Sequence, residues 1–319
     1  VEALGHLHQA DGLAVALRPG IAEIVLHAAD GIAALLVADL VCRLPAQGDA
    51  LAFDPATPFV FSSAITAQIG SRLKVAGAKD LIAQCRQIKS ATEIAIIQAA
   101  MTASLRVHKA VWEGLHEGIS TTEVTDFIAA AHAKLGMRHI FAAAQFGEAT
   151  AYPHGVPYAQ TLNKGDMVLI DLGAHIHRYC SDITRTYVFG EPTDRQRELW
   201  ALEQKAHRAA FDAAKIGTPC EDVDFAARKV LTDAGYGPGY KVPGLPHRTG
   251  HGLGMDMHED PYIVRGNKTP LQPGMVFSDE PMLALYGECG VRLEDIIYMS
   301  EEGPVFFTEP SRSIDQPFG

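Results

Sequence analysis

The stretch that decides the fold is residues 167–189, MVLIDLGAHIHRYCSDITRTYVF. Two runs of apolar and β-branched residues flank a polar centre, which is typical of two β-strands joined as a hairpin. A tight turn at Ile176-His177 would place Asp171 directly opposite Asp182. Like charges facing each other across a ladder, with Cβ atoms about 5 Å apart, are destabilising. The pattern therefore predicts a cation between the two carboxylates.

A second segment, residues 280–294 (EPMLALYGECGVRLE), has the same character. Its turn at residues 286–288 (YGE) would set Glu280 opposite Glu294. Two hairpins that each offer a facing pair of carboxylates favour two hard divalent cations bridged by carboxylates, an arrangement that activates water.

The composition excludes several classes of protein. Of the 319 residues, 47% are hydrophobic and 20% are charged, as in ordinary globular proteins, and the net charge is −11. No run of Lys or Arg occurs, which argues against nucleic acid or an anionic membrane as a partner. The best apolar run, residues 32–44, is interrupted by Asp39 and Arg43 and is too short to span a bilayer. Five scattered cysteines without C-x-x-C spacing indicate reduced thiols and a cytoplasmic location.

A change in the pattern of apolar and polar residues near Ser90 predicts two domains. Residues 1–87 alternate short apolar runs with Gly, Pro and Asp breaks, which is typical of a small α/β domain. In residues 88–319, Ser90 and Ser120 each begin a capping box, S-x-x-E, ahead of apolar residues at helical spacing. Two amphipathic helices are therefore expected before the first hairpin.

The same order returns after that hairpin. Residues 193–214 and 221–234 have the apolar spacing of two further helices, and residues 118–124 (GISTTEV) parallel residues 217–223 (GTPCEDV). Each half ends in a carboxylate hairpin. The repeat predicts an internally duplicated catalytic domain, with two helix–helix–hairpin halves around a pseudo-twofold axis. The alternative is that the matches reflect turn chemistry alone.

Three histidines follow in the glycine-rich stretch 247–259, HRTGHGLGMDMHE. Glycine lets backbone and ligand approach closely. One imidazole added to two aspartates and two glutamates makes a five-ligand, oxygen-rich set. Such a set suits Mn²⁺, with Co²⁺, Fe²⁺ or Zn²⁺ as further occupants, better than a thiolate-type zinc site. Each carboxylate alone would more often belong to a turn or a solvated face, and the facing pairs are what favour a metal centre.

These motifs together resemble a known family. The series IDLG-x₇-SDITRT, H-x₃-GHGLG-x₃-HE, DEP and GVRLED is similar to the pita-bread metallopeptidases, in particular to their Xaa-Pro aminopeptidase and prolidase branch. The resemblance covers residue 88 to the C-terminus. It implies an α+β, creatinase/aminopeptidase-like catalytic domain at residues 88–319, preceded by a creatinase-type domain at residues 1–87 that is shorter than expected and whose opening strands are missing.

The resemblance also implies the metal ligands. They would be Asp171, Asp182, His251, Glu280 and Glu294. This set would hold two divalent ions, with Mn²⁺ preferred, and Asp182 and Glu294 would bridge them. Glu280 would accept a proton from the attacking water.

The other histidines would serve the substrate. His154 would line the pocket and help with the developing charge, and His258 would contact the scissile carbonyl. His247 is a feature of the proline-directed branch. The resemblance further implies a small peptide substrate with proline at its second position, and a homodimer.

Several polar neighbours are expected to hold the ligands in place. Arg292 and Asp295 flank Glu294 in the VRLED strand, and Arg292 is also expected to face the substrate. Thr184 is expected to hold the carboxylate of Asp182 in place.

Two departures from the family pattern leave alternative functions open. Met282 stands where the family has Gly after Glu-Pro, and its side chain would narrow or reshape the pocket. Arg178 stands in the first turn where Gly is common, so a bulge could shift the register there. The first rival to an Xaa-Pro peptidase is a non-peptidase amide hydrolase or lyase on the same metal site, favoured by Met282. The second is an inactive binding module, which the complete ligand set disfavours.

Overall fold

The computed structural model describes residues 13–18, 21–26 and 50–318 of the chain. Contacts between Cα atoms divide the protein into two compact units, Val1–Cys85 and Arg86–Gly319, which we describe separately.

The described part of the first unit combines short strands with helices. Strands β1 (Leu13–Arg18) and β2 (Ile21–Leu26) form an antiparallel hairpin, and β3 (Ala50–Phe53) pairs in parallel with β4 (Lys74–Gly77). The connection from β3 to β4 runs through helix α2 (Phe59–Ile69) and the short 3₁₀ helix η1 (Gly70–Arg72), and helix α3 (Lys79–Gln87) follows β4. This mixture agrees with the α/β character expected of the region, and the remainder of residues 1–49 lies outside the described part of the chain.

The second unit has the order helix, helix, hairpin twice, as the sequence predicts. The first half contains α4 (Ala91–Gly114), α5 (Thr121–Lys134), β5 (Arg138–Phe146), the 3₁₀ helix η2 (Gly147–Ala151), β6 (Met167–Ile176) and β7 (Tyr179–Val188). The second half contains α6 (Asp194–Ala213), α7 (Cys220–Asp233), β8 (Gly250–Gly252), β9 (Glu259–Ile263), β10 (Val276–Asp279), β11 (Met282–Leu285), β12 (Cys289–Arg292), β13 (Asp295–Ser300) and β14 (Gly303–Phe306).

Helix starts follow from local capping chemistry. Ser90 and Ser120 each accept a hydrogen bond from the backbone N–H three residues on, and the glutamate there bonds back to the cap residue. Thr193 forms the same box with Gln196 at the start of α6. Each cap satisfies otherwise unpaired helix N–H groups and contributes about 1 kcal/mol. The two capping boxes read from the sequence are therefore confirmed.

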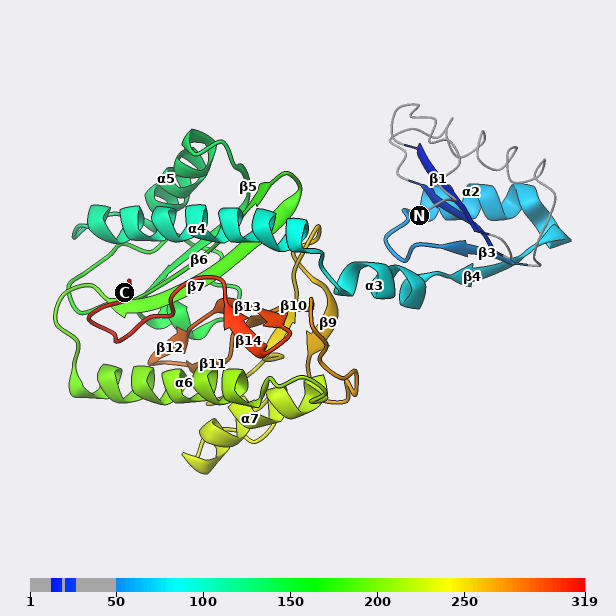
Figure 1. The fold of residues 1–319 in the computed structure, drawn as a ribbon. Coiled ribbons are helices and arrows are strands. Elements are labelled where there is room, and N and C mark those ends of the chain that lie inside the picture. Colours follow the sequence, from blue (N-terminus) through cyan, green and yellow to red (C-terminus); the bar gives the residue numbers. More distant parts are fainter. Residues whose placement is uncertain (1–12, 19–20, 27–49, 319) are drawn as a thin grey trace. The chain divides into compact units, whose positions relative to one another are not determined.

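Helices cover the strands of the second unit on two sides. In Figure 1 these strands lie between the α4–α5 pair and the α6–α7 pair. Helix α4 packs on β6 and β7, α5 packs on β5, and α6 packs on β10 to β12. Buried apolar side chains fill both interfaces, with Val107, Ile128 and Ile170 in the first and Leu199 and Phe277 in the second. Each helix pair therefore covers its strands through an apolar interface.

The first hairpin turns one position later than predicted. Strands β6 and β7 pair without a bulge, and the turn residues are His177-Arg178 rather than Ile176-His177. Both turn residues have positive φ, 47° and 72°. A two-residue hairpin turn needs this geometry to match the twist of its strands, although it normally recruits Asn or Gly. The side chains at the turn gave no signal for its position.

This register corrects the predicted facing pair. Asp171 lies opposite Thr184, and Asp182 lies opposite Gly173. The two aspartates still share a face of the sheet, because side chains alternate with a period of two. They approach diagonally, across Gly173. A Cβ at Gly173 would lie 2.5 Å from the ring of Phe141, so a side chain there would displace its neighbours.

The register predicted for the second hairpin is confirmed. Strands β11 and β12 pair so that Met282 lies opposite Arg292, and the ladder of β10 with β13 continues in the same register. Glu280 and Glu294 lie in the gap between these two ladders. The backbone of Glu294 instead forms a bridge to Thr184 of the first hairpin, which joins the two halves of the unit.

Two predictions from composition can be compared with the described residues. Cys85, Cys180, Cys220 and Cys289 are free thiols, and Cys42 lies outside the described part of the chain. Within residues 13–18, 21–26 and 50–318, no helix combines the length and apolar character that crossing a bilayer requires.

Candidate active site

The five predicted metal ligands, the three predicted substrate histidines and Arg292 line one cavity of about 530 Å³ in the second unit. Carboxylates and one imidazole form its floor, namely Asp171, Asp182, His251, Glu280 and Glu294. The remaining polar lining comes from His154, His247, Arg248, His258 and Arg292. The two hairpins and the glycine-rich stretch therefore meet at one place, although up to 140 residues of sequence separate the groups.

Three of the floor residues are arranged as a metal site. Asp182, His251 and Glu294 are buried and offer ligand atoms that all lie within 4.8 Å of one another. Oδ1 of Asp182 and Oε1 of Glu294 have no hydrogen-bond partner. Burying oxygen atoms without a hydrogen-bond partner costs free energy. A cation bound between these oxygens would offset that cost.

The orientation of His251 supports the same conclusion. Its Nδ1 lies 3.0 Å from the carbonyl oxygen of Gly252, and since a carbonyl only accepts, Nδ1 carries the proton. Nε2 is then an acceptor, yet it lies 3.3 Å from Oε1 of Glu280 and 3.7 Å from Oδ2 of Asp182. A cation between these acceptor atoms would compensate their mutual repulsion. Burial lowers the pKa of His251 to about 3, so the ring remains neutral and able to bind a metal ion.

The electrostatics of the carboxyl groups agree with this geometry. Burial, and then repulsion from Glu294, raises the pKa of Asp182 well above its usual range. Burial and repulsion from Glu280 do the same to the pKa of Glu294. Burial raises the pKa of Glu280 to about 7 despite the opposing effect of Arg292. A divalent cation favours the ionised forms, so the donor set present here fits a metal ion.

A close approach of backbone strands positions His251. A Cβ built on Gly250 would lie 1.9 Å from the carbonyl oxygen of Ser278, so glycine alone allows β8 to lie this near β10. Oγ of Ser278 accepts a 2.9 Å hydrogen bond from the backbone N–H of His251. Gly250 therefore allows the close packing of β8 on β10 that positions His251.

Arg292 donates hydrogen bonds to three residues, two of them in the first hairpin. Its Nη2 donates to Oδ2 of Asp171 at 2.7 Å, its Nη1 to the carbonyl oxygen of Pro153 at 3.1 Å, and its Nε to Oγ1 of Thr184 at 3.1 Å. The expected support of Glu294 by Arg292 is therefore indirect and runs through Thr184.

Thr184 holds Glu294 and not Asp182, which corrects the prediction. Its Oγ1 donates a 2.6 Å hydrogen bond to Oε2 of Glu294. The reason is the register of the first hairpin, which places Thr184 opposite Asp171, together with the backbone bridge that brings Glu294 alongside. One oxygen of Glu294 is thereby fixed, and the other is left free to bind a cation.

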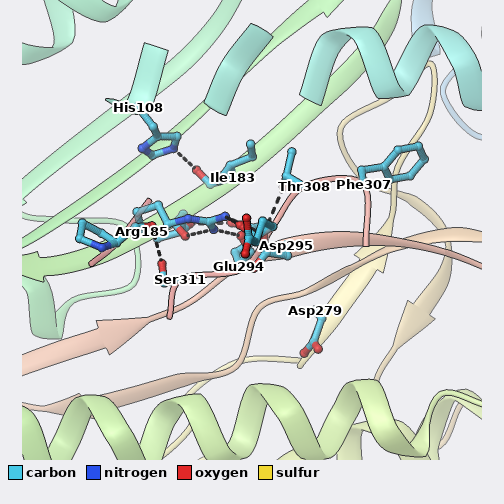
Figure 2. Close-up of polar contacts among 12 residues, drawn as sticks. His108, Ile183, Arg185, Asp279, Glu294, Asp295, Phe307, Thr308 and Ser311 are labelled. Carbon is cyan, nitrogen blue, oxygen red and sulfur yellow. Dashed lines mark hydrogen bonds and ion pairs between the residues drawn. The ribbon is translucent and has the colours of Figure 1, made fainter. Parts of the chain in front are cut away.

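Figure 2 shows a support that the sequence analysis missed. Arg185, with no exposed side-chain surface, donates from Nη2 to Oδ1 of Asp295 at 2.7 Å and from Nη1 to the carbonyl oxygen of Glu294 at 2.8 Å. Asp295 therefore acts on the Glu294 backbone through Arg185. A charged residue within a buried apolar strand was the signal in the sequence that could have identified it.

The remaining three histidines line the same cavity. The ring of His258 meets that of His251 edge-on, with centroids 4.1 Å apart, and His154 is exposed. His247 bonds the carbonyl oxygen of Arg248 through Nδ1 at 2.7 Å, while its Nε2 is buried without a partner. Burial lowers the pKa of His247 to about 3, so its Nε2 is a hydrogen-bond acceptor.

Met282 does not narrow the cavity. Its side chain is fully buried in the apolar core around Leu199 and Val291, and it is not among the residues that line the pocket. The apolar lining comes instead from Phe141, Met257 and Val264. The pocket is thus not reshaped at the position where the sequence departs from the family pattern.

The helix–helix–hairpin halves and the shared carboxylate–histidine centre define the pita-bread fold. The model of metallopeptidase family M24 matches residues 95–301, and the chain belongs to this family. A probable dipeptidase PepE from Mycobacterium tuberculosis is 41% identical over 230 residues, 72% of this chain and 60% of that protein. The chain thus spans less than two thirds of that relative's length.

Solved structures share the fold. A dipeptidase PepE from Mycobacterium ulcerans is 35% identical, with a TM-score of 0.79 over 88% of this chain and 73% of the other. The prolidase from Pyrococcus furiosus is 31% identical, with a TM-score of 0.77 over 83% of this chain and 77% of the other.

Proposed function

We propose that this protein is a dinuclear metal-dependent peptidase that hydrolyses the Xaa-Pro bond of dipeptides or of peptide N-termini. The observation that carries the proposal is the buried group of Asp182, His251 and Glu294, whose free acceptor atoms converge within 4.8 Å in a chain of a metallopeptidase family. The relatives called dipeptidase and prolidase support a short peptide substrate.

Two divalent ions would be held by the oxygen-rich set already described. Its members are Asp171, Asp182, His251, Glu280 and Glu294. Four carboxylates and one imidazole suit Mn²⁺ well, with Co²⁺, Fe²⁺ and Zn²⁺ as further candidates. When bound, such ions lower the pKa of a water molecule and polarise the scissile carbonyl.

The side chains of the chain itself supply the proton transfers. Glu280 accepts the proton of the attacking water, because its carboxylate faces the cavity and its environment raises its affinity for a proton. His154 and His258 stabilise the developing oxyanion and protonate the departing nitrogen from the open side of the cavity. A proline nitrogen carries no hydrogen in the peptide, so it requires this proton to leave as an amine.

The position of Met282 removes the reason for the non-peptidase rival, since this side chain lies in the core. All five proposed ligand side chains line one cavity, which argues against an inactive binding module. Homodimerisation and a cytoplasmic location stay predictions, which light scattering and cell fractionation would test.

The experiment measures the release of free amino acids from peptides by protein stripped with chelator and reloaded with Mn²⁺. Substrates are Ala-Pro, Leu-Pro, Ala-Ala and a longer Xaa-Pro peptide, with Asp182→Ala as the control. We expect Mn²⁺ to restore cleavage of Xaa-Pro bonds in the parent protein alone. Cleavage of Ala-Ala as fast as Ala-Pro would reject proline specificity, and metal binding without any cleavage would reject the peptidase function.

A further inference from the structure

The loop that carries His258 is folded around one buried carboxylate. Residues 253–258, which we call the His258 loop, join β8 to β9, and Met257 and His258 line the cavity. Glu259, the next residue, begins β9 and does not line the cavity, and 7% of its side chain is exposed. Since adjacent side chains of an extended chain lie on opposite faces, a group that holds Glu259 also restricts the position of His258.

Three donors hold the carboxylate of Glu259. Nζ of Lys89 donates to Oε1 at 2.6 Å, and Nη2 of Arg86 donates to Oε2. The backbone N–H of Asp256 also donates to Oε2, at 3.3 Å. Nη1 of Arg86 bonds Oδ2 of Asp256 at 2.7 Å. The same guanidinium therefore holds both the His258 loop and the strand that follows it.

Lys89 is itself held in place. Its side chain is 1% exposed, and its backbone N–H donates to the carbonyl oxygen of Gly274, just before β10, at 2.8 Å. A Cβ at Gly254 would lie 2.6 Å from Oε1 of Glu259 and 3.0 Å from Cε of Lys89, so glycine allows the loop to close over the ion pair. A buried pair holds its residues in one arrangement, whereas solvent screens an exposed pair.

The backbone of the loop determines where the ring of His258 lies. This ring meets that of His251, a proposed metal ligand, edge-on with centroids 4.1 Å apart. With the residues that the structure describes, the ring of His258 makes no hydrogen bond that could orient it in another way. The contacts of Glu259 are therefore the polar anchor nearest to His258 in the sequence.

We propose that Lys89 is a positioning residue for catalysis, which fixes through its ion pair with Glu259 the backbone that presents His258 to the scissile carbonyl. The inference rests on the proposed function, in which His258 stabilises the developing charge. Lys89 and Glu259 are 170 residues apart in the sequence, so the pair ties the segment before α4 to the His258 loop. Lys89 does not line the cavity, and its effect on the reaction would pass through this loop.

The test asks whether Lys89 acts through His258. Lys89→Met removes the charge and keeps the length of the side chain. With Mn²⁺-loaded protein and Ala-Pro, we expect kcat to fall about 10- to 100-fold, because a displacement of about 1 Å can cost this much. KM and the Kd for Mn²⁺ should stay within about twofold of the parent values, since neither substrate binding nor the ligands are changed. Adding Lys89→Met to His258→Ala should cause no further loss of kcat, because the positioned group is already gone.

Two controls separate positioning from stability and from charge. Ile128→Ala weakens the apolar core between α5 and the first sheet, and it should leave kcat unchanged at a temperature where the protein is folded. Lys229→Met removes an exposed cation that pairs with Asp233, and it should also leave kcat unchanged.

An unchanged kcat in Lys89→Met would overturn the inference, as would equal fractional losses in the parent and in the His258→Ala background. NMR of protein labelled with ¹³C-histidine needs no turnover, so it separates this result from failure of the proposed function. If the ring signal of His258, assigned by its loss in His258→Ala, shifts in Lys89→Met while that of His132 does not, Lys89 positions His258. In that case, a parent that cleaves no peptide refutes the peptidase function alone. An unshifted His258 signal overturns the inference whatever the parent cleaves.

Discussion

Arg185 and Asp295 form an ion pair sealed from solvent, with Nη2 of the arginine 2.7 Å from Oδ1 of the aspartate and side chains 0% and 1% exposed (Figure 2). The same guanidinium bonds the backbone of Glu294, a predicted metal ligand. This single contact joins the strand after the second hairpin to β7 of the first. It therefore couples the stability of the unit to the assembly of its metal centre.

Replacing Arg185 by Ala is expected to lower the free energy of unfolding by about 3–5 kcal/mol, because it leaves the buried Asp295 without its arginine and with only Thr308 and His207 beside its carboxylate. Urea denaturation measures this change. The matched control is Arg208→Ala, which breaks an exposed pair with Asp212 and should cost at most about 1 kcal/mol. Equal effects of the two substitutions would contradict the buried pair's assigned role.

Removal of metal is expected to lower the melting temperature. An ion that binds only the folded state stabilises it by about 2.7 kcal/mol at a hundredfold excess over Kd. Scanning calorimetry with Mn²⁺ titrated into chelator-treated protein measures the effect. Asp182→Asn should abolish the response to Mn²⁺, and without metal it should be at least as stable as the parent, since one repelling buried carboxylate is gone. A parent melting temperature indifferent to Mn²⁺ would rule the centre out.

The first hairpin turn holds two residues in a left-handed conformation. Substituting Arg178, at φ 72°, by Gly is expected to stabilise the protein by about 0.5–1 kcal/mol, because relief of backbone strain exceeds the added freedom of the unfolded chain. The reciprocal variant is Gly287→Ala in the second turn, at φ 81°, which should destabilise by a similar amount. Chemical denaturation of both proteins measures these changes in the free energy of unfolding. A loss of stability in Arg178→Gly would refute the turn geometry.

His108 gives stability a dependence on pH. Burial, and then the charge of Arg185, lowers the pKa of His108 to about 3 from a usual 6.5, while its Nε2 donates to the carbonyl oxygen of Ile183 (Figure 2). Between these values the unfolded chain binds a proton that the folded chain does not. Stability therefore falls as the pH falls from 6.5 towards 3, by about 1.4 kcal/mol per unit.

The variant His108→Gln retains an amide donor and cannot take up this proton. We expect the loss of stability between pH 7 and pH 5 to be about 2 kcal/mol smaller in the variant than in the parent. Urea unfolding at both pH values measures the difference. Parallel curves for the two proteins would show that His108 is not buried in its neutral form.

Local chemistry allowed the helices to be predicted closely. Ser90 and Ser120 open helices where the capping boxes indicated, because a cap is formed by residues three apart and needs no information from the rest of the chain. The second hairpin was predicted correctly for a related reason. Gly287 tolerates positive φ and marks the turn, which sets the register of both strands.

The first hairpin shows where that reasoning fails. His177 and Arg178 adopt positive φ without being typical turn residues, so the turn was predicted one residue early and the partner of Asp171 was predicted as Asp182 instead of Thr184. The predicted contact of Thr184 with Asp182 depended on that register, so this prediction was wrong as well. The contacts of Arg185 join segments far apart in sequence, so the local pattern marks the residue only as a charge within an apolar strand and does not identify its partners.

The turn at His177-Arg178 is exposed, and neither residue lines the cavity. Nevertheless its length fixes which face of the sheet receives Asp171 and Asp182, since sliding one strand by one residue reverses every side chain on it. Surface turns of this kind usually accept inserted residues. Here a single added residue, placed where it touches none of the polar groups of the centre, would turn one of the two aspartates away from the other.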